Sequence, residues 1–290
     1  MKENFFTKDK NFYKTFFRLM LVVALQNLVA YSVNMLDNMM LGSYSQNALS
    51  GAATVNQIFF MVNQLALAIG NALIVMSSQY WGKRDTHTIK KLTGIAMTCS
   101  VAAAVIVVLV CAVWPEQLLR LFTTSPDIIA EGMTYLSILK WTFALFLISN
   151  LLISMLRSVE TVQISFIISI VSLIVNGGIN YTLIFGNFGF PEMGIQGAAI
   201  GTLTARILEF LIVIVYVLKI DKKVQIFHGG LLQETFSTVS RGLWKNFVKV
   251  SSPVIVSGML WAVSVPMQTA ILGHLSADAI AANSVSTTFF

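Results

Sequence analysis

The chain has 290 residues, of which 56% are hydrophobic and only 11% are charged, and its net charge is +6. A soluble domain carries about 25% charged residues, so this chain has too few charges to cover a water-facing surface of its size. Its basic residues lie in short segments between long uncharged runs, which a polytopic α-helical membrane protein explains better than a nucleic-acid-binding protein.

Apolar runs of about 20 residues mark the membrane helices, because a helix of that length spans the hydrocarbon core. The first run follows a polar, basic segment that lacks the features of a cleavable signal peptide. In chain order we predict spans at about residues 16–42, 50–79, 92–114, 132–156, 163–186, 194–219 and 247–273. An eighth span begins near residue 277, and because the chain stops inside it we expect a truncated protein.

Lysine and arginine alternate between the two sides of these spans. Sixteen of them fall in the N-terminal segment and after the second, fourth and sixth spans, whereas the opposite side carries Arg120 alone. Basic residues accumulate in cytoplasmic loops. The pattern therefore predicts a multi-pass protein of the cell membrane with its N-terminus in the cytoplasm.

One long polar stretch divides the chain. We predict an N-terminal lobe of six helices over residues 1–219, a cytoplasmic connector over 220–246 and the start of a C-terminal lobe over 247–290. Comparison of the chain with itself at an offset of 231 residues places Leu36–Gly42 over Met267–Gly273. The seventh span would then repeat the first in the same orientation, as in transporters built from parallel repeats. Chance similarity between apolar segments is the alternative.

Five stretches resemble, in their order and spacing, the multidrug and toxic compound extrusion (MATE) family. They are Asp37 and Gly42 with Ala48–Ala52 ahead of Gln79–Asp85, then Leu156–Ser158, Asn176–Gly186, Pro191–Thr202, and Pro253 with Gly273. The resemblance extends over the chain from about residue 15. It implies a secondary antiporter with two six-helix lobes around a central cavity, which exports cationic or amphipathic organic compounds and is driven by inward Na⁺ or H⁺. We expect no cofactor besides that coupling ion, and a monomer.

Asp37 is the most informative polar residue. It lies roughly 27 Å along the first span at the rise of an α-helix, and a carboxylate at membrane depth usually faces a cavity, an ion or a partner. The family carries a functional acid at the matching place, so the resemblance implies that Asp37 binds a cation, with Na⁺ as one candidate. The alternative is that Asp37 lies at the outer interface and only caps the helix.

Asn176 and Asn180 are spaced i, i+4 and share one face of the fifth span, at roughly the depth of Asp37. Their amides can ligate Na⁺ or bind polar substrates, although asparagine equally often joins helices in membranes. Some family members carry an acid where Asn180 stands, so a two-carboxylate proton site does not carry over. Thr202 matches the family's small-residue start of the sixth span, where packing competes with ligand binding. We predict that Asp37 faces the two asparagines and not lipid.

Three other charged residues fall in the interior of the spans, away from their ends. Arg206 and Glu209 are spaced i, i+3, which predicts an ion pair inside the bundle. Lys140 lies in the fourth span, where we expect its long side chain to snorkel outward.

Other functions are less well supported. A lipid-linked oligosaccharide flippase of the same superfamily is the main alternative. Such proteins line the cavity with several cations, whereas the deep positions here offer one acid, Asp37, and only Lys140 and Arg206 as cations. This balance favours the export of cations. The sequence has no phosphate-binding loop, catalytic triad or interfacial cluster of His, Asp or Ser, so we do not expect an enzyme.

Overall fold

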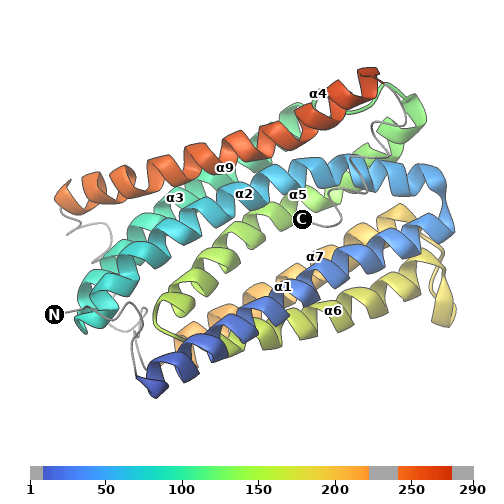
Figure 1. Ribbon diagram of the computed structural model, residues 1–290. Coiled ribbons are helices and arrows are strands. Elements are labelled where there is room, and N and C mark those ends of the chain that lie inside the picture. The colour runs from blue at the N-terminus through green and yellow to red at the C-terminus, as the bar shows by residue number, and fades with distance from the viewer. Residues whose placement is uncertain (1–8, 222–240, 276–290) are drawn as a thin grey trace.

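The computed structural model describes residues 9–221 and 241–275 as a bundle of long helices (Figure 1). The long helices are α1 (Lys10–Tyr44), α2 (Gln46–Gly82), α3 (Thr86–Val113), α5 (Pro126–Ser158), α6 (Gln163–Ile184), α7 (Ile195–Val215) and α9 (Arg241–Leu275). The short ones are α4 (Pro115–Arg120), η1 (Asn187–Gly189) and η2 (Tyr216–Ile220). Most of the predicted connector and the predicted eighth span lie outside the described residues.

The all-α membrane fold predicted from composition is confirmed. Each of the seven predicted spans up to residue 273 coincides with one long helix. Among the described residues, six helical segments are long and apolar enough to cross a membrane, namely α1, α2, α3, α5, α6 and the Arg241–Ser264 part of α9. α7 is not among these six, but it packs along α6 in the same bundle. Most of the helices begin or end a few residues outside the apolar runs, because polar capping residues extend them.

The basic residues gather at one end of the bundle, as their alternation predicts. α1, α3, α6 and α9 begin there, and α2, α5 and α7 end there (Figure 1). This end carries Lys83, Arg84, Lys90 and Arg157, and we call it the basic end. The short connections after α1, α4 and α6 lie at the opposite end (Figure 1).

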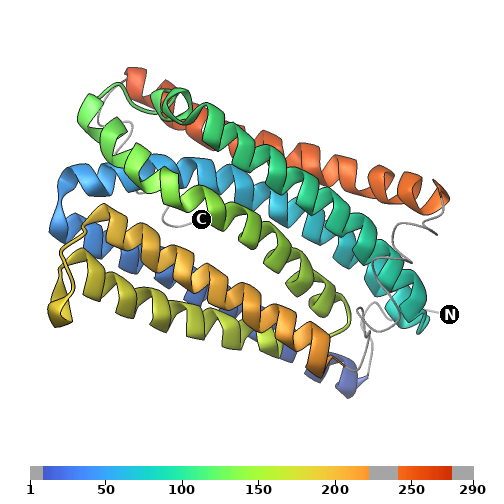
Figure 2. The same ribbon diagram turned by 180° about the vertical axis from the view of Figure 1, so that it is seen from behind.

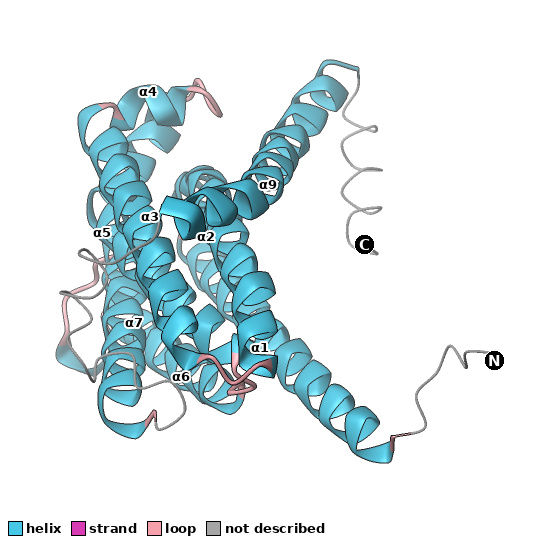
Figure 3. Ribbon diagram, turned by 90° about the vertical axis from the view of Figure 1, so that its left-hand side faces the viewer, coloured by secondary structure: helices cyan, strands magenta, loops and turns pink. Residues whose placement is uncertain are grey.

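α5 forms the centre of the bundle and packs against α2, α3 and α7. Its neighbours α3 and α7 lie on either side of it when the bundle is seen from behind (Figure 2). Two apolar clusters fill the space around α5, one near Phe143 and the other near Leu152, and both side chains are fully buried. By contrast, α1 packs mainly on α6, and α9 on α2. Both of these outer helices lie at the margins of the bundle (Figure 3).

Local sequence explains the joints between helices. A single residue, Ser45, separates α1 from α2, and its hydroxyl caps α2 by accepting from the Ala48 amide at 3.5 Å. Asp85 caps α3 in the same way, accepting from the Thr88 amide at 3.0 Å and from its hydroxyl at 2.6 Å. The sequence analysis missed α4, a helix of six residues that opens with Pro115 at its first position.

Candidate functional site

A polar cluster lies inside the bundle where α1, α6 and α7 meet. Asp37 is one of two buried residues of α1, with 9% of its surface exposed. The Asn180 side-chain amide donates a hydrogen bond to its carboxylate at 2.5 Å. Asp37 therefore faces the interior, and the alternative that it only caps α1 at the outer interface is wrong.

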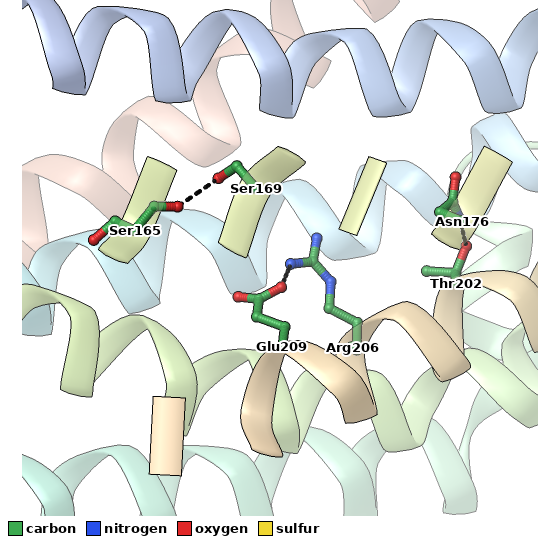
Figure 4. Close-up of polar contacts among 6 residues, drawn as sticks. All are labelled: Ser165, Ser169, Asn176, Thr202, Arg206 and Glu209. Atoms are coloured by element: carbon green, nitrogen blue, oxygen red, sulfur yellow. Dashed lines mark hydrogen bonds and ion pairs between the residues drawn. The ribbon is translucent and has the colours of Figure 1, made fainter. Parts of the chain in front are cut away.

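The cluster continues as a chain of hydrogen bonds. Asn180 Nδ2 also approaches Asn176 Oδ1 at 3.4 Å, and Asn176 Nδ2 donates to Thr202 Oγ1 at 3.3 Å (Figure 4). Both asparagines are buried on the face of α6 that their i, i+4 spacing predicts. The structure thus brings together all four candidate residues, and the predicted proximity of Asp37 to both asparagines is confirmed. Their role in binding a cation stays a prediction.

One oxygen of this cluster has no hydrogen-bond donor. Asn180 Oδ1 is buried and unpaired among the described residues, and it lies toward Gly201 of α7, while the nitrogen of the same amide contacts the Asp37 carboxylate. A buried acceptor without a partner costs free energy. A small cation on the carboxylate is the kind of ligand that would satisfy this amide oxygen as well, once the amide turns its oxygen toward Asp37. No three His, Cys, Asp or Glu side chains gather in the described ranges, so this single-carboxylate site suits a monovalent cation better than a divalent one.

Two glycines permit the close packing of the cluster. A Cβ at Gly201 of α7 would overlap Asn180 Oδ1, and a Cβ at Gly177 of α6 would lie 2.7 Å from the Leu36 side chain of α1. Glycine at both positions therefore lets α6 approach α1 and α7 closely enough for short polar side chains to meet.

A buried tyrosine adds to the cluster. Tyr135 of α5 is 3% exposed and lies within hydrogen-bonding reach of Thr202, where it also feels the charge of Asp37. The sequence analysis did not single it out. The available signal was general, since a tyrosine within an apolar run needs a partner for its hydroxyl.

The predicted ion pair of α7 is confirmed. Arg206 Nη1 lies 2.7 Å from Glu209 Oε2, one turn from the cluster on the side of the basic end (Figure 4). The guanidinium also lies over two aromatic rings, with its centre 4.9 Å from that of Phe146 and 5.8 Å from that of Phe59. Cation–π contacts of this kind stabilise a partly desolvated arginine.

Lys140 does not join the cluster. Its amine lies 5.7 Å from the ring centre of Trp141, a residue with 56% of its surface exposed. This contact agrees with the outward orientation expected of a lysine that snorkels.

Comparison with known proteins decides the family. A family model described as MatE matches residues 23–182, which is more than half of the chain. The chain belongs to the MATE family. Members of this family are multi-pass membrane transporters and not enzymes, in agreement with the expectations drawn from the sequence.

Several curated relatives of this MATE protein carry multidrug names. "Probable multidrug resistance protein NorM" of Rhizobium meliloti is 27% identical over 221 residues, which cover 74% of this chain and 47% of the relative. "Probable multidrug resistance protein YoeA" of Bacillus subtilis is 24% identical over 275 residues, covering 92% and 58%. NorM of Thermotoga maritima is 26% identical, covering 94% and 57%. The chain therefore spans about half the length of the relatives it matches.

Solved structures share the fold of this MATE chain. A MOP superfamily transporter from Pyrococcus furiosus, for which a reversed polarity of the binding pocket is said to suggest a different function, matches with a TM-score of 0.82 at 17% identity, over 95% of this chain and 59% of that one. A multidrug resistance MATE transporter in an outward-facing conformation matches with a TM-score of 0.78 at 18% identity, over 89% and 55%. At such identities the likeness shows the fold alone.

Proposed function

We propose that this chain forms the N-terminal lobe, and the start of a second lobe, of a transporter that exports cationic or amphipathic organic compounds in exchange for inward Na⁺ or H⁺. The multidrug names of the curated relatives support export of such compounds. The same relatives do not favour the flippase alternative.

The observation that carries the antiport mechanism is the buried Asp37 carboxylate in contact with the Asn180 amide, whose oxygen is buried and unpaired among the described residues. A carboxylate inside a membrane bundle is costly, and a cation bound at Asp37 would offset part of that cost. With a cation bound, an exchange of the amide orientation of Asn180 would present its oxygen to the ion, with Asn176 and Thr202 completing the polar shell. A proton on Asp37 would instead keep Asn180 as a hydrogen-bond partner.

Coupling follows if the cation and the exported compound favour different arrangements of α1. Two ligands that stabilise different states of one lobe weaken each other's binding by the same factor, and this mutual exclusion links their fluxes. Within this proposal the basic end faces the cytoplasm, the protein lies in the cell membrane, and the lobes follow the parallel-repeat plan.

Replacement of Asp37 tests the proposal most directly. In liposomes containing the complete transporter, Asp37→Asn should reduce ion-driven efflux of a cationic dye to the level of empty liposomes, because the amide keeps the shape but cannot carry the charge. Asp127→Asn, the same change at an exposed position of α5, is the matched control and should retain efflux. Undiminished ion-driven efflux by Asp37→Asn at equal protein content would remove the site assignment.

Asn180→Ala distinguishes the coupling ions. If Na⁺ is the coupling ion, loss of an oxygen ligand should raise the Na⁺ concentration needed for half-maximal efflux. If H⁺ is the coupling ion, efflux should remain driven by a pH gradient and show no dependence on Na⁺.

A further inference from the structure

Arg206 interacts with two buried carboxylates on different helices. It pairs with Glu209 on its own helix at 2.7 Å, and its charge also acts on Asp37 of α1. The Glu209 side chain is 9% exposed and that of Arg206 is 24% exposed. Ions held this far from water depend on their partners for stability. Pairing of the Arg206 guanidinium with either Glu209 or Asp37 therefore changes the stability of both carboxylates in their charged form.

Arg206 pairs with a glutamate on its C-terminal side, which is the less favourable order of the two charges along an α-helix. Cα–Cβ bonds tilt toward the N-terminus of an α-helix, which for Arg206 is the direction of Thr202 and the Asp37 cluster. The side chain instead reaches Glu209, which is C-terminal to it, in the order of charges that stabilises a helix less. In Figure 4 the guanidinium lies between the Glu209 carboxylate and the Asn176–Thr202 pair.

The charges of this region do not cancel. Asp37 and Glu209 contribute two negative charges and Arg206 one positive charge, so one more monovalent cation is needed for neutrality. The titratable groups that face this part of the described bundle are Asp37 on α1, Tyr135 on α5, and Arg206 and Glu209 on α7. When the cation leaves Asp37, the guanidinium is the nearby positive charge that can replace it.

We propose that Arg206 is a positioning residue that exchanges between two carboxylates, pairing with Glu209 while Asp37 holds the coupling cation and turning to Asp37 when that cation leaves. The guanidinium thereby acts as a tethered competitor of the transported ion. Thr202, which marks the level of the Asp37 cluster, and Glu209 are about 10.5 Å apart along α7 at the rise of a helix. Arg206 lies between them, so its long side chain can turn from one to the other by changing its rotamers. The inference rests on the proposed function, since it assumes that Asp37 binds the coupling ion.

Because Arg206 competes with the cation for Asp37, removal of Arg206 and removal of Glu209 should change the affinity for the cation in opposite directions. Arg206→Gln removes the competitor and should tighten cation binding at Asp37. Glu209→Gln releases Arg206 from its partner, leaves it on Asp37 and should weaken cation binding. Each shift should be about 10-fold, within the usual range of 5–150-fold for coupling between sites. An ion pair whose Arg206 never reaches Asp37 would change the affinity only through its two screened charges, so the effects of the two single variants would add in the double variant.

The test is a cation titration of the purified complete transporter, followed by tryptophan fluorescence. Na⁺ is the probe at constant pH, and if the wild type shows no Na⁺ response, proton uptake in Na⁺-free buffer is measured instead. The double variant Arg206→Gln, Glu209→Gln should bind the cation about as tightly as Arg206→Gln alone, because Glu209 acts on Asp37 through Arg206. Arg206→Lys keeps the competing charge and should lie nearest to the wild type.

The outcomes separate this inference from the proposed function. If Asp37→Asn leaves cation binding unchanged, the proposed site itself is wrong. If Asp37→Asn abolishes binding but Arg206→Gln and Glu209→Gln shift it in the same direction or not at all, the exchange of partners is wrong and the site stands. Should a single variant fail to fold, Arg206→Met with Glu209→Met replaces the buried pair by apolar side chains, which such sites often tolerate. This double variant should bind the cation more tightly than the wild type, and weaker binding would overturn the inference.

Discussion

α1 and α5 have similar lengths, 35 and 33 residues, but the structure holds them in different ways. α5 buries side chains along its whole length and joins both apolar clusters, whereas Asp37 and Leu41 are the buried residues of α1. α1 is tied to the lobe by polar contacts, from Asp37 to Asn180 and from Gln26 to Arg157. Polar contacts can be exchanged for an ion without opening the core. This difference suits α5 to be the fixed centre of the lobe and α1 to be the part that would respond to the proposed cation.

The largest effect on stability is expected at the centre of α5. Phe143 is fully buried and stacks on Phe59 with ring centres 6.0 Å apart. Phe143→Ala should lower the free energy of unfolding by about 3–5 kcal/mol, because it leaves a cavity that its neighbours cannot fill. Met35→Ala on α1, at a residue with 65% of its surface exposed, should change it by less than about 0.5 kcal/mol. Unfolding in detergent measures both, and equal losses would contradict the proposed difference between the helices.

An intermediate effect is expected where α1 meets α5. Arg157 Nη2 donates to Gln26 Oε1 at 2.8 Å, and Arg157 Nε is buried without a partner among the described residues. Gln26→Leu should destabilise this contact by about 1–3 kcal/mol, because the guanidinium loses its acceptor. Hydrogen exchange should then become faster in the first half of α1 and stay unchanged in α5.

Gln26→Glu is the control for this contact, since it keeps an acceptor oxygen and adds a charge that complements Arg157. Exchange in α1 should be as slow as in the wild type. Faster exchange in Gln26→Glu would show that the shape of the glutamine, and not its acceptor, holds α1.

Apart from the control at Met35, the smallest effect is expected at the joint between α2 and α3, which belongs to neither helix of the comparison. Hydrogen bonds from the Thr88 hydroxyl and then from its backbone amide lower the pKa of Asp85. The carboxylate therefore contributes stability above its unfolded pKa of about 3.9, and this contribution is lost as the pH falls through the lower folded value. Asp85→Ala should cost about 1 kcal/mol at neutral pH. Thermal unfolding of the variant and the wild type should converge in strong acid, and a constant difference would contradict the role of the charge.

Much of the fold could be predicted from the sequence, because apolar runs long enough to cross a bilayer mark α1 to α3, α5 to α7 and α9 independently of packing. The proximity of Asp37 to Asn176 and Asn180 followed from depth along two helices and from the i, i+4 spacing. Tyr135 could not be placed in the same way, since its reach to Thr202 depends on how α5 packs beside α7. The rings around Arg206 and the partner of Gln26 were missed for the same reason, because hydropathy does not encode which helices are neighbours.

The single residue between α1 and α2 has a mechanical consequence. At 1.5 Å per residue, Asp37 lies about 12 Å from Ser45 along α1, and Gln26 lies about 28 Å from it. If α1 tilts as a rigid rod about this joint, a displacement of the carboxylate is magnified more than twofold at Gln26. The helix is then a lever with its fulcrum at Ser45, so that a movement as small as the radius of an ion at one end becomes a larger stroke at the basic end.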